Sequence, residues 1–350
     1  MTTIPTRPVP GRPLALSELS LGCSQLGNMY REVSDADARG TVDTAWELGL
    51  RYFDTAPHYG LGLSERRLGA ALVLRPRETY VVSSKVGRML EAVDIVDGLD
   101  DQGFVVPATH RRRWDFSREG IRRSLEESLE RLGLDRLDIA YLHDPDEHWT
   151  DVLATGYAAL EELRTDGIVG AIGAGMNQSA MLADLVRETD LDVVMLAGRY
   201  TLLEQDALDD LLPLCCERRV AVVAAGVFNS GLLARECPRD DAKYDYGEAP
   251  RRLVERAQAI ARICGQHGTT LPAAALAFPL GHQAVASVCV GARSAAQMAR
   301  NEALYCEPIA SDLWSELKAE GLLRTDAPVP TETTWLPKRI AKEAAARELE

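Results

Sequence analysis

Four side chains that suit proton transfer stand at or just after the ends of short apolar runs. Asp54 ends one run in the stretch YFDTAPHYG and Tyr59 follows it, while Lys85 ends VVSSK and His143 ends IAYLH. A free tyrosine has a pKa of about 10, so a nearby lysine ammonium would favour its phenolate, and an aspartate would hold that lysine charged. A histidine opposite can hydrogen-bond a substrate oxygen. Together these residue types predict general acid/base chemistry.

Apolar runs alternate with amphipathic stretches along the chain, as in proteins with a parallel sheet covered by helices. Eight such strands favour a single-domain (β/α)8 TIM barrel, whose functional residues gather at the C-terminal ends of the strands. A doubly wound sheet is the alternative, but LGCSQLGN after the first strand lacks GxGxxG. The predicted strands are residues 19–23, 52–54, 80–84, 139–143, 169–174, 193–196, 220–224 and 286–290, and the predicted helices are 34–49, 117–133, 151–167, 206–219, 250–267 and 294–305.

Three segments are longer than ordinary connections: residues 86–116, residues 232–249 and the tail from residue 327. In a barrel such long loops usually shape the mouth of the site. We therefore expect a barrel over residues 1–326 with long loops at its C-terminal face, followed by a loop and helical tail over residues 327–350.

Composition excludes several classes of function. The chain has 350 residues, 46% of them hydrophobic, and a formal charge of -14, which argues against nucleic acid or an anionic membrane as the partner. The basic clusters at 111–113 and 251–252 are interpreted as solvated loop and helix-start residues. Seven scattered cysteines without zinc-ligand spacing predict reduced thiols and no metal site. With no apolar signal or membrane-length run, we expect a cytoplasmic protein; its oligomeric state stays open.

The segments FDTAPHYG, SSK and LHDPD resemble the three catalytic segments of the aldo-keto reductase family, and the resemblance extends over essentially the whole chain. It implies a catalytic tetrad of Asp54, Tyr59, Lys85 and His143, with Tyr59 as general acid/base and Asp54 as the anchor of Lys85. His58 is then a non-catalytic neighbour.

The resemblance also implies a nicotinamide dinucleotide lying across the barrel mouth. GAGMN resembles the carboxamide-binding segment, VFNSGLL the pyrophosphate loop with its backbone amides, and GARSAAQMARN the adenosine segment. Met176 stands where the family usually has a serine, so one hydrogen bond is expected to be missing. The implied cofactor-binding residues are Gly22, Cys23, Asn177, Phe228, Asn229, Ser230, Gly231, Leu232, Gly291, Arg293, Ser294, Gln297 and Asn301.

Two departures from the family pattern concern this cofactor. Gln297 replaces an arginine that faces the 2′-phosphate in many NADP-preferring members, which favours NAD. Arg293 can substitute for that charge and leaves NADP open. Ala225 stands near the position of the aromatic ring that commonly stacks on nicotinamide, so Phe228 is the alternative platform.

Longer segments, among them HYGLGLSERRLGAAL and AAGVFNSGLLA, resemble the branch containing aldose 1-dehydrogenases and pyridoxal 4-dehydrogenase. This implies oxidation of an aldose hemiacetal of the L-fucose or D-threo-aldose type at carbon 1 to the lactone. Pyridoxal oxidation, aldehyde reduction, Schiff-base chemistry at Lys85 and a non-catalytic nucleotide-binding subunit remain as alternatives. The candidate substrate contacts are Trp114, Arg113, His110, Arg199 and Tyr200.

Overall fold

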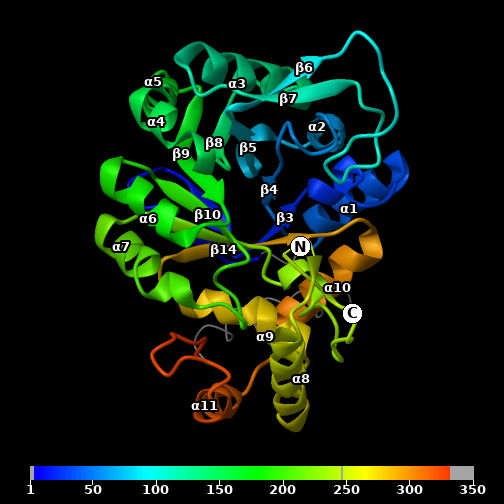
Figure 1. Ribbon diagram of the computed structural model, residues 1–350, viewed down its shortest axis with the longest axis vertical. Coiled ribbons are helices and arrows are strands. Elements are labelled where there is room, and N and C mark those ends of the chain that lie inside the picture. The colour runs from blue at the N-terminus through cyan, green and yellow to red at the C-terminus, as the bar shows by residue number, and fades with distance from the viewer. Residues whose placement is uncertain (1–3, 246, 332–350) are drawn as a thin grey trace.

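Eight parallel strands close into a barrel, which confirms the predicted (β/α)8 fold (Figure 1). The computed structural model describes residues 4–245 and 247–331. Each predicted strand overlaps an observed one. In order around the barrel these are β3 (Leu19–Gly22), β4 (Tyr52–Asp54), β5 (Val81–Val86), β8 (Leu137–His143), β9 (Val169–Met176), β10 (Val193–Ala197), β11 (Ala221–Ala225) and β14 (Val285–Gly291).

Helices follow the strands and surround the barrel (Figure 1). The predicted cap of α1 is present, because Ser34 Oγ accepts from the Asp37 amide at 3.0 Å. Helices α2, α6, α9 and α11 lie outside the predicted ranges; every residue of α9 is buried, so it has no amphipathic period. None of the described helices is long and apolar enough to span a membrane. The helices are α1 (Asp35–Glu47), α2 (Leu63–Leu72), α3 (Arg118–Leu132), α4 (Trp149–Asp151), α5 (Tyr157–Thr165), α6 (Ser179–Glu188), α7 (Leu211–Arg218), α8 (Arg251–Gln266), α9 (Leu271–Ala277), α10 (Ala295–Cys306) and α11 (Ser311–Ala319).

A hairpin that the sequence analysis missed closes the floor of the barrel. It pairs β1 (Thr6–Pro8) with β2 (Ala15–Ser17), strands too short to show alternation. Val9 and Leu16 are buried in the barrel interior with Tyr52 and Tyr141. Access to the interior is therefore from the C-terminal ends of the strands.

The long segment 86–116 contains an antiparallel hairpin of β6 (Arg88–Ala92) and β7 (His110–Trp114), which we call the insert hairpin. The loop between its strands is tied to the segment after β3, because the Tyr30 amide donates to Gly103 O at 2.7 Å. Its Phe104 packs in a small apolar cluster with Leu61, against which Tyr59 lies. The insert hairpin thus covers the loop that follows β4.

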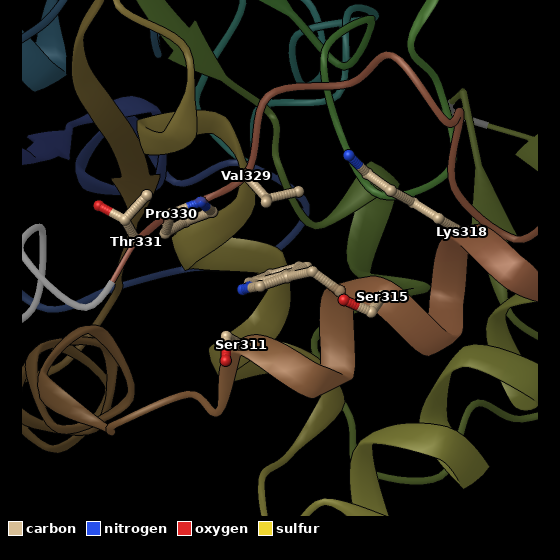
Figure 2. Close-up of a pocket in the computed structure, with 7 residues that line it drawn as sticks. Ser311, Ser315, Lys318, Val329, Pro330 and Thr331 are labelled. Atoms are coloured by element: carbon tan, nitrogen blue, oxygen red, sulfur yellow. The ribbon is translucent and has the colours of Figure 1, made fainter.

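Of the other two long segments, residues 232–249 connect β11 to α8 at the C-terminal face of the barrel, and the tail lies beside α11. Residues 232–249 contain the short pair β12 (Lys243–Tyr244) and β13 (Gly247–Glu248), held by the Tyr244 hydroxyl donating to Glu204 at 2.6 Å. Residues 327–331 end beside α11, where Val329, Pro330 and Thr331 face Ser311 and Ser315 across a pocket (Figure 2). The predicted tail continues into residues 332–350, outside the described residues.

Two glycines with positive φ make a matched test of the packing around the β4 loop. Gly60 (φ 63°) has no room for a side chain, since its Cβ would lie 2.3 Å from Gly27 O, whereas Gly133 (φ 67°) has nothing within 4 Å. We expect Gly133→Ala to cost about 1–2 kcal/mol of unfolding free energy for the left-handed conformation alone. Gly60→Ala must add a backbone clash and cost clearly more, measured by urea unfolding. Equal losses for the two variants would contradict this packing.

Candidate active site

Three of the four predicted proton-transfer residues lie at the C-terminal ends of adjacent strands. Asp54 is the last residue of β4, His143 the last of β8, and Lys85 the next-to-last of β5. The register places Asp54 beside Ser83 and Lys85 beside Tyr141. Each of the three side chains is almost fully buried. The closed barrel therefore brings them together, as the sequence predicted.

Asp54 and Lys85 form a buried ion pair. The Lys85 ammonium donates to Asp54 Oδ2 at 2.7 Å, to Oδ1 at 3.0 Å and to the Thr55 carbonyl at 2.9 Å. Burial is the largest single effect and lowers the pKa of Lys85, but Asp54 and Tyr59 together, through charge and hydrogen bonds, raise the pKa above its ordinary value. Lys85 is accordingly a fixed cation.

A chain of hydroxyl groups supports this pair from inside the barrel. Ser83 Oγ donates to Asp54 Oδ1 at 2.7 Å and lies 3.0 Å from the Tyr52 hydroxyl. The Tyr52 hydroxyl is in turn 3.1 Å from that of Tyr141. The carboxylate is thus held by the Ser83 hydroxyl as well as by the ammonium, both from β5.

Tyr59 lies over the ion pair, with Lys85 Nζ 4.9 Å from its ring centroid. Its ring is 6.1 Å from that of His143, nearly perpendicular to it. Burial raises the pKa of Tyr59, and Lys85 lowers it by a smaller amount, so the net shift is upward. Lys85 lowers the pKa of Tyr59 as expected, but this effect is smaller than the opposite effect of burial, which the sequence argument did not include.

His143 is a neutral imidazole. Burial, then the positive charge of Lys85, lowers its pKa well below the ordinary value. Its Nδ1 has no hydrogen-bond partner within the described residues, and its Nε2 lies 3.6 Å from Asp144 Oδ2. Asp144 has a left-handed backbone (φ 40°) and pairs with Arg88 of β6 at 3.6 Å. A neutral imidazole can hold a substrate oxygen without adding charge to the site.

The residues predicted to bind the nicotinamide end of a cofactor lie at strand ends. Gly22 pairs with both Asp54 and Gly291, and the Cys23 amide donates to Asp54 O at 2.8 Å. Asn177 follows β9 and is partly exposed. These positions border the tetrad, and their cofactor contacts stay a prediction.

The predicted pyrophosphate loop is a tight turn of left-handed residues. The amides of Asn229, Gly231 and Leu232 donate to carbonyls within the turn, so they are not free to meet phosphate oxygens in this conformation. Asn229 Nδ2 donates to Gly198 O at 3.0 Å, while its Oδ1 is buried without a partner among the described residues. Ser230 is exposed and Phe228 partly exposed, and both remain candidates for contact.

The predicted adenosine segment forms the start of α10. Ser294 caps the helix by accepting from the Gln297 amide at 3.3 Å, and Gln297 Oε1 accepts from the Arg293 amide at 3.1 Å. Asn301 is buried and donates to Gly291 O at 3.3 Å. The side chains of Gln297 and Asn301 thus have structural roles in this segment, and their contact with an adenine stays a prediction.

Two of the predicted substrate contacts lie away from the tetrad. Tyr200 is 1% exposed and its ring packs on Phe278 at 5.1 Å, in the core outside the barrel strands, which argues against a substrate contact. Arg199 pairs with Asp245 of the 232–249 segment at 2.9 Å. The two residues are consecutive after β10, but the first faces the 232–249 segment and the second faces the core, a difference that the sequence does not show.

The alternation of β7 divides the remaining candidates. Trp114 is partly buried; it stacks on Phe116 at 5.9 Å, and the Arg88 guanidinium lies 4.8 Å from its ring. Arg113 faces outward and pairs with Glu91 and Asp115. His110 lines a pocket between α2 and α3, with Arg66 and Arg131. Trp114 is connected to the site through Arg88, which also pairs with Asp144 beside His143.

Arg112 corrects the interpretation of the basic cluster at 111–113 as solvated. Its side chain is 4% exposed and pairs with Asp100, whose side chain is 3% exposed. The sequence analysis missed Arg112, Asp100, Arg88 and Asp144. The two-residue period from Trp114 would have placed Arg112 on the inner face of β7, whereas nothing local in the sequence marks Asp100 as its partner.

Comparisons with known proteins agree with this geometry. The model of the Aldo/keto reductase family matches residues 18–320. A D-threo-aldose 1-dehydrogenase from a Pseudomonas species is 49% identical over 89% of this chain and 96% of its own. A pyridoxal 4-dehydrogenase from Microbacterium luteolum is 38% identical over 89% of this chain and 95% of its own.

Solved structures have the same fold. An aldo-keto reductase from Bacillus halodurans superposes with a TM-score of 0.72 at 25% identity, covering 95% of this chain and 99% of its own. A glycerol dehydrogenase from Gluconobacter oxydans gives a TM-score of 0.74 at 24% identity, covering 95% and 98%. The family match over most of the chain, the related sequences and the barrel with its strand-end cluster lead to one conclusion: this chain belongs to the aldo/keto reductase family of oxidoreductases.

Proposed function

We propose that the protein oxidises the carbon-1 hemiacetal hydroxyl of an aldose to the lactone, with a nicotinamide dinucleotide as co-substrate. The observation that carries the proposal is the buried Asp54–Lys85 pair beside Tyr59, with neutral His143 next to the same phenol. The aldose as substrate class is supported by the relative named D-threo-aldose 1-dehydrogenase, 49% identical to this chain.

Each residue of the tetrad has one task in this reaction. Tyr59, as phenolate, takes the proton of the carbon-1 hydroxyl, and His143 holds that oxygen while the carbonyl forms. Lys85 stabilises the phenolate by charge, and Asp54 keeps Lys85 in place. When bound, the nicotinamide ring supplies the acceptor for the hydride that leaves carbon 1.

The residues around the mouth fit such a dinucleotide. The buried Asn229 Oδ1 is an acceptor without a partner among the described residues, in the loop predicted to contact the cofactor. Burial, and to a smaller extent the charge of Arg31, lowers the pKa of Arg293 at the start of α10, so the two guanidinium groups lie within electrostatic reach of each other. We propose NAD as the preferred form because Gln297 is neutral. Arg293 and Arg31 are the cations that would contact the 2′-phosphate when NADP binds instead.

Polar groups beside His143 suit a polyol. The Asp144 side chain is 40% exposed, and a carboxylate accepts hydrogen bonds from hydroxyl groups. Trp114 lies nearby, since Arg88 contacts both residues; its ring is held by Arg88 and Phe116, and its partly exposed side chain can add an apolar contact. Pyridoxal is the second candidate, supported by the relative named pyridoxal 4-dehydrogenase; its aromatic ring would use Trp114 in the same way.

Initial rates of NADH formation with L-fucose, other aldoses and pyridoxal test this function. We expect the highest kcat/KM with an aldose and a fall of about 10²–10⁴-fold in kcat for Tyr59→Phe, the usual contribution of a general base. Binding of the dinucleotide, followed by fluorescence, should be unchanged. Tyr80→Phe serves as control, because the Tyr80 ring packs edge-to-face against Trp46 outside the barrel. Higher rates with pyridoxal than with every aldose would select the second candidate.

The pH dependence of oxidation tests the role of Lys85. Oxidation requires the phenolate of Tyr59, whose pKa is raised by burial and partly lowered by Lys85, so kcat/KM should rise with pH on the alkaline side. The double variant Asp54→Asn/Lys85→Met leaves no unpaired buried charge. It removes the lowering effect of Lys85 on the pKa of Tyr59 together with the smaller raising effect of Asp54, so the net change is upward. We expect the rising limb to move to higher pH, and an unmoved limb would remove Lys85 from this role.

The preference for NAD or NADP tests the role of Arg293, which lies just before α10. Because a guanidinium gives a charge-assisted bond to phosphate, Arg293→Gln should raise KM for NADP by roughly tenfold and KM for NAD by much less. Arg300→Gln on the same helix, whose side chain donates to Ala234 O, is the control. Equal changes for the two dinucleotides would show that Arg293 does not face the 2′-phosphate.

A further inference from the structure

His58 lies in the mouth of the site, immediately before Tyr59. Its ring is 5.6 Å from that of His143, 5.1 Å from Phe104 and 6.0 Å from Tyr59. It is partly exposed, unlike His143. The tetrad leaves this imidazole without a task.

The insert hairpin fixes the tautomer of His58. Arg112 Nε donates to His58 Nδ1 at 2.6 Å, and Arg112 Nη2 donates to the His58 carbonyl at 3.2 Å. A guanidinium has only donors, so Nδ1 must accept and cannot carry a proton. In the neutral ring the proton is therefore on Nε2.

Arg112 is itself held firmly. Its guanidinium makes two contacts with the Asp100 carboxylate, Nη1 to Oδ1 and Nη2 to Oδ2, the second at 3.2 Å. Asp100 Oδ2 also accepts from the amides of Gln102 at 3.2 Å and Phe104 at 3.4 Å. A buried pair of this kind serves orientation more than stability. What it orients here is one imidazole.

The surroundings of His58 keep it neutral. Burial, followed by the charges of Arg88 on β6, Arg112 on β7 and Lys85 on β5, lowers its pKa to about 2. The other titratable groups close to it are the neutral His143 and Tyr59 and the ion-paired Asp100. His58 is therefore a donor at Nε2 throughout the neutral range.

This Nε2–H group has no acceptor within residues 4–245 and 247–331. An Nε2 atom without a partner could still be buried, but this one is not fully buried and therefore reaches the surface of the mouth. A donor whose tautomer is fixed by a buried ion pair, open to the site and adjacent to His143, is arranged to meet an oxygen of the substrate.

We propose that His58 is a specificity-determining residue whose Nε2–H, oriented by the positioning residues Arg112 and Asp100, donates to the hydroxyl on the carbon next to the reacting carbon. The inference rests on the proposed function, since His143 is taken to hold the reacting oxygen. Two imidazole rings side by side then address two neighbouring oxygens of one molecule. The substrate class is thereby narrowed to carbonyl or hemiacetal compounds with an adjacent hydroxyl.

Two matched substrate pairs and two variants test this proposal. The pairs are an aldose and its 2-deoxy analogue in oxidation, and 2-hydroxypropanal and propanal in reduction. His58→Asn keeps an acceptor for Arg112 near Nδ1 but has no donor at the Nε2 position, whereas His58→Gln places an amide donor there. His267→Asn, at the end of α8, is the control because His267 bonds Glu316 outside the site.

We expect the wild-type protein to prefer the hydroxylated member of each pair, and His58→Asn to reduce that preference roughly tenfold, the value of one lost hydrogen bond. kcat/KM for the hydroxylated members should fall about tenfold more than kcat/KM for the deoxy members, and His58→Gln should restore part of the preference. An unchanged preference in His58→Asn overturns the inference. If the wild-type protein turns over no aldose but His58→Asn loses the preference for 2-hydroxypropanal over propanal, this inference stands and the proposed aldose function is wrong. If neither pair is turned over, both proposals are wrong.

The positioning role of Arg112 has a readout that needs no substrate. Nitrogen-15 NMR of the free protein should show His58 with an unprotonated Nδ1 and a protonated Nε2, with no titration between pH 5 and 8. In Arg112→Leu/Asp100→Asn, which leaves no buried charge unpaired, the pKa of His58 should rise by the Arg112 contribution alone, since burial and Arg88 still lower it, and the tautomer should become mixed. A wild-type His58 that titrates in this range, or carries its proton on Nδ1, overturns the assignment.

Discussion

The site depends on one ion pair, between Asp54 and Lys85. Burying a single charge here would cost several kcal/mol of folding free energy. The charges of Asp54 and Lys85 offset each other, and Ser83 and the Thr55 carbonyl add hydrogen bonds to the pair. The partners come from β4 and β5, so the pair forms only when the two strands are in register. The pair thus links the chemistry to the fold, since Lys85 acts on Tyr59 only from this position.

Around this pair the protein controls charge closely. Burial works against ionisation of every group at the mouth: it keeps His143 neutral and raises the pKa of Tyr59. The insert hairpin then brings two further cations, Arg88 and Arg112, and each has its own carboxylate nearby. Each positive charge around the reacting centre therefore has a carboxylate close by, while Arg88 and Arg112 still help to keep His58 and His143 neutral.

The sequence was most informative where one strand determines the result. Asp54 and His143 could be placed at strand ends because apolar runs end there, and a closed parallel barrel brings such ends together. It was least informative where partners come from distant segments. Arg112 was taken as solvated because its contact with Asp100 depends on a hairpin whose strands are mostly polar. Likewise, the β1–β2 floor was missed because three-residue strands carry no period.

The closure of the barrel has a consequence for how the chain reaches this state. The ring is completed by β3 against β14, and Ser287 Oγ donates to the carbonyl of Ser17, 270 residues away in sequence. Until the last strand leaves the ribosome, β3 and β11 keep open edges that other chains can pair with. Contacts of such long separation form slowly. Newly made chains are therefore exposed to aggregation for most of their synthesis, and chaperone capacity should limit the yield of active protein.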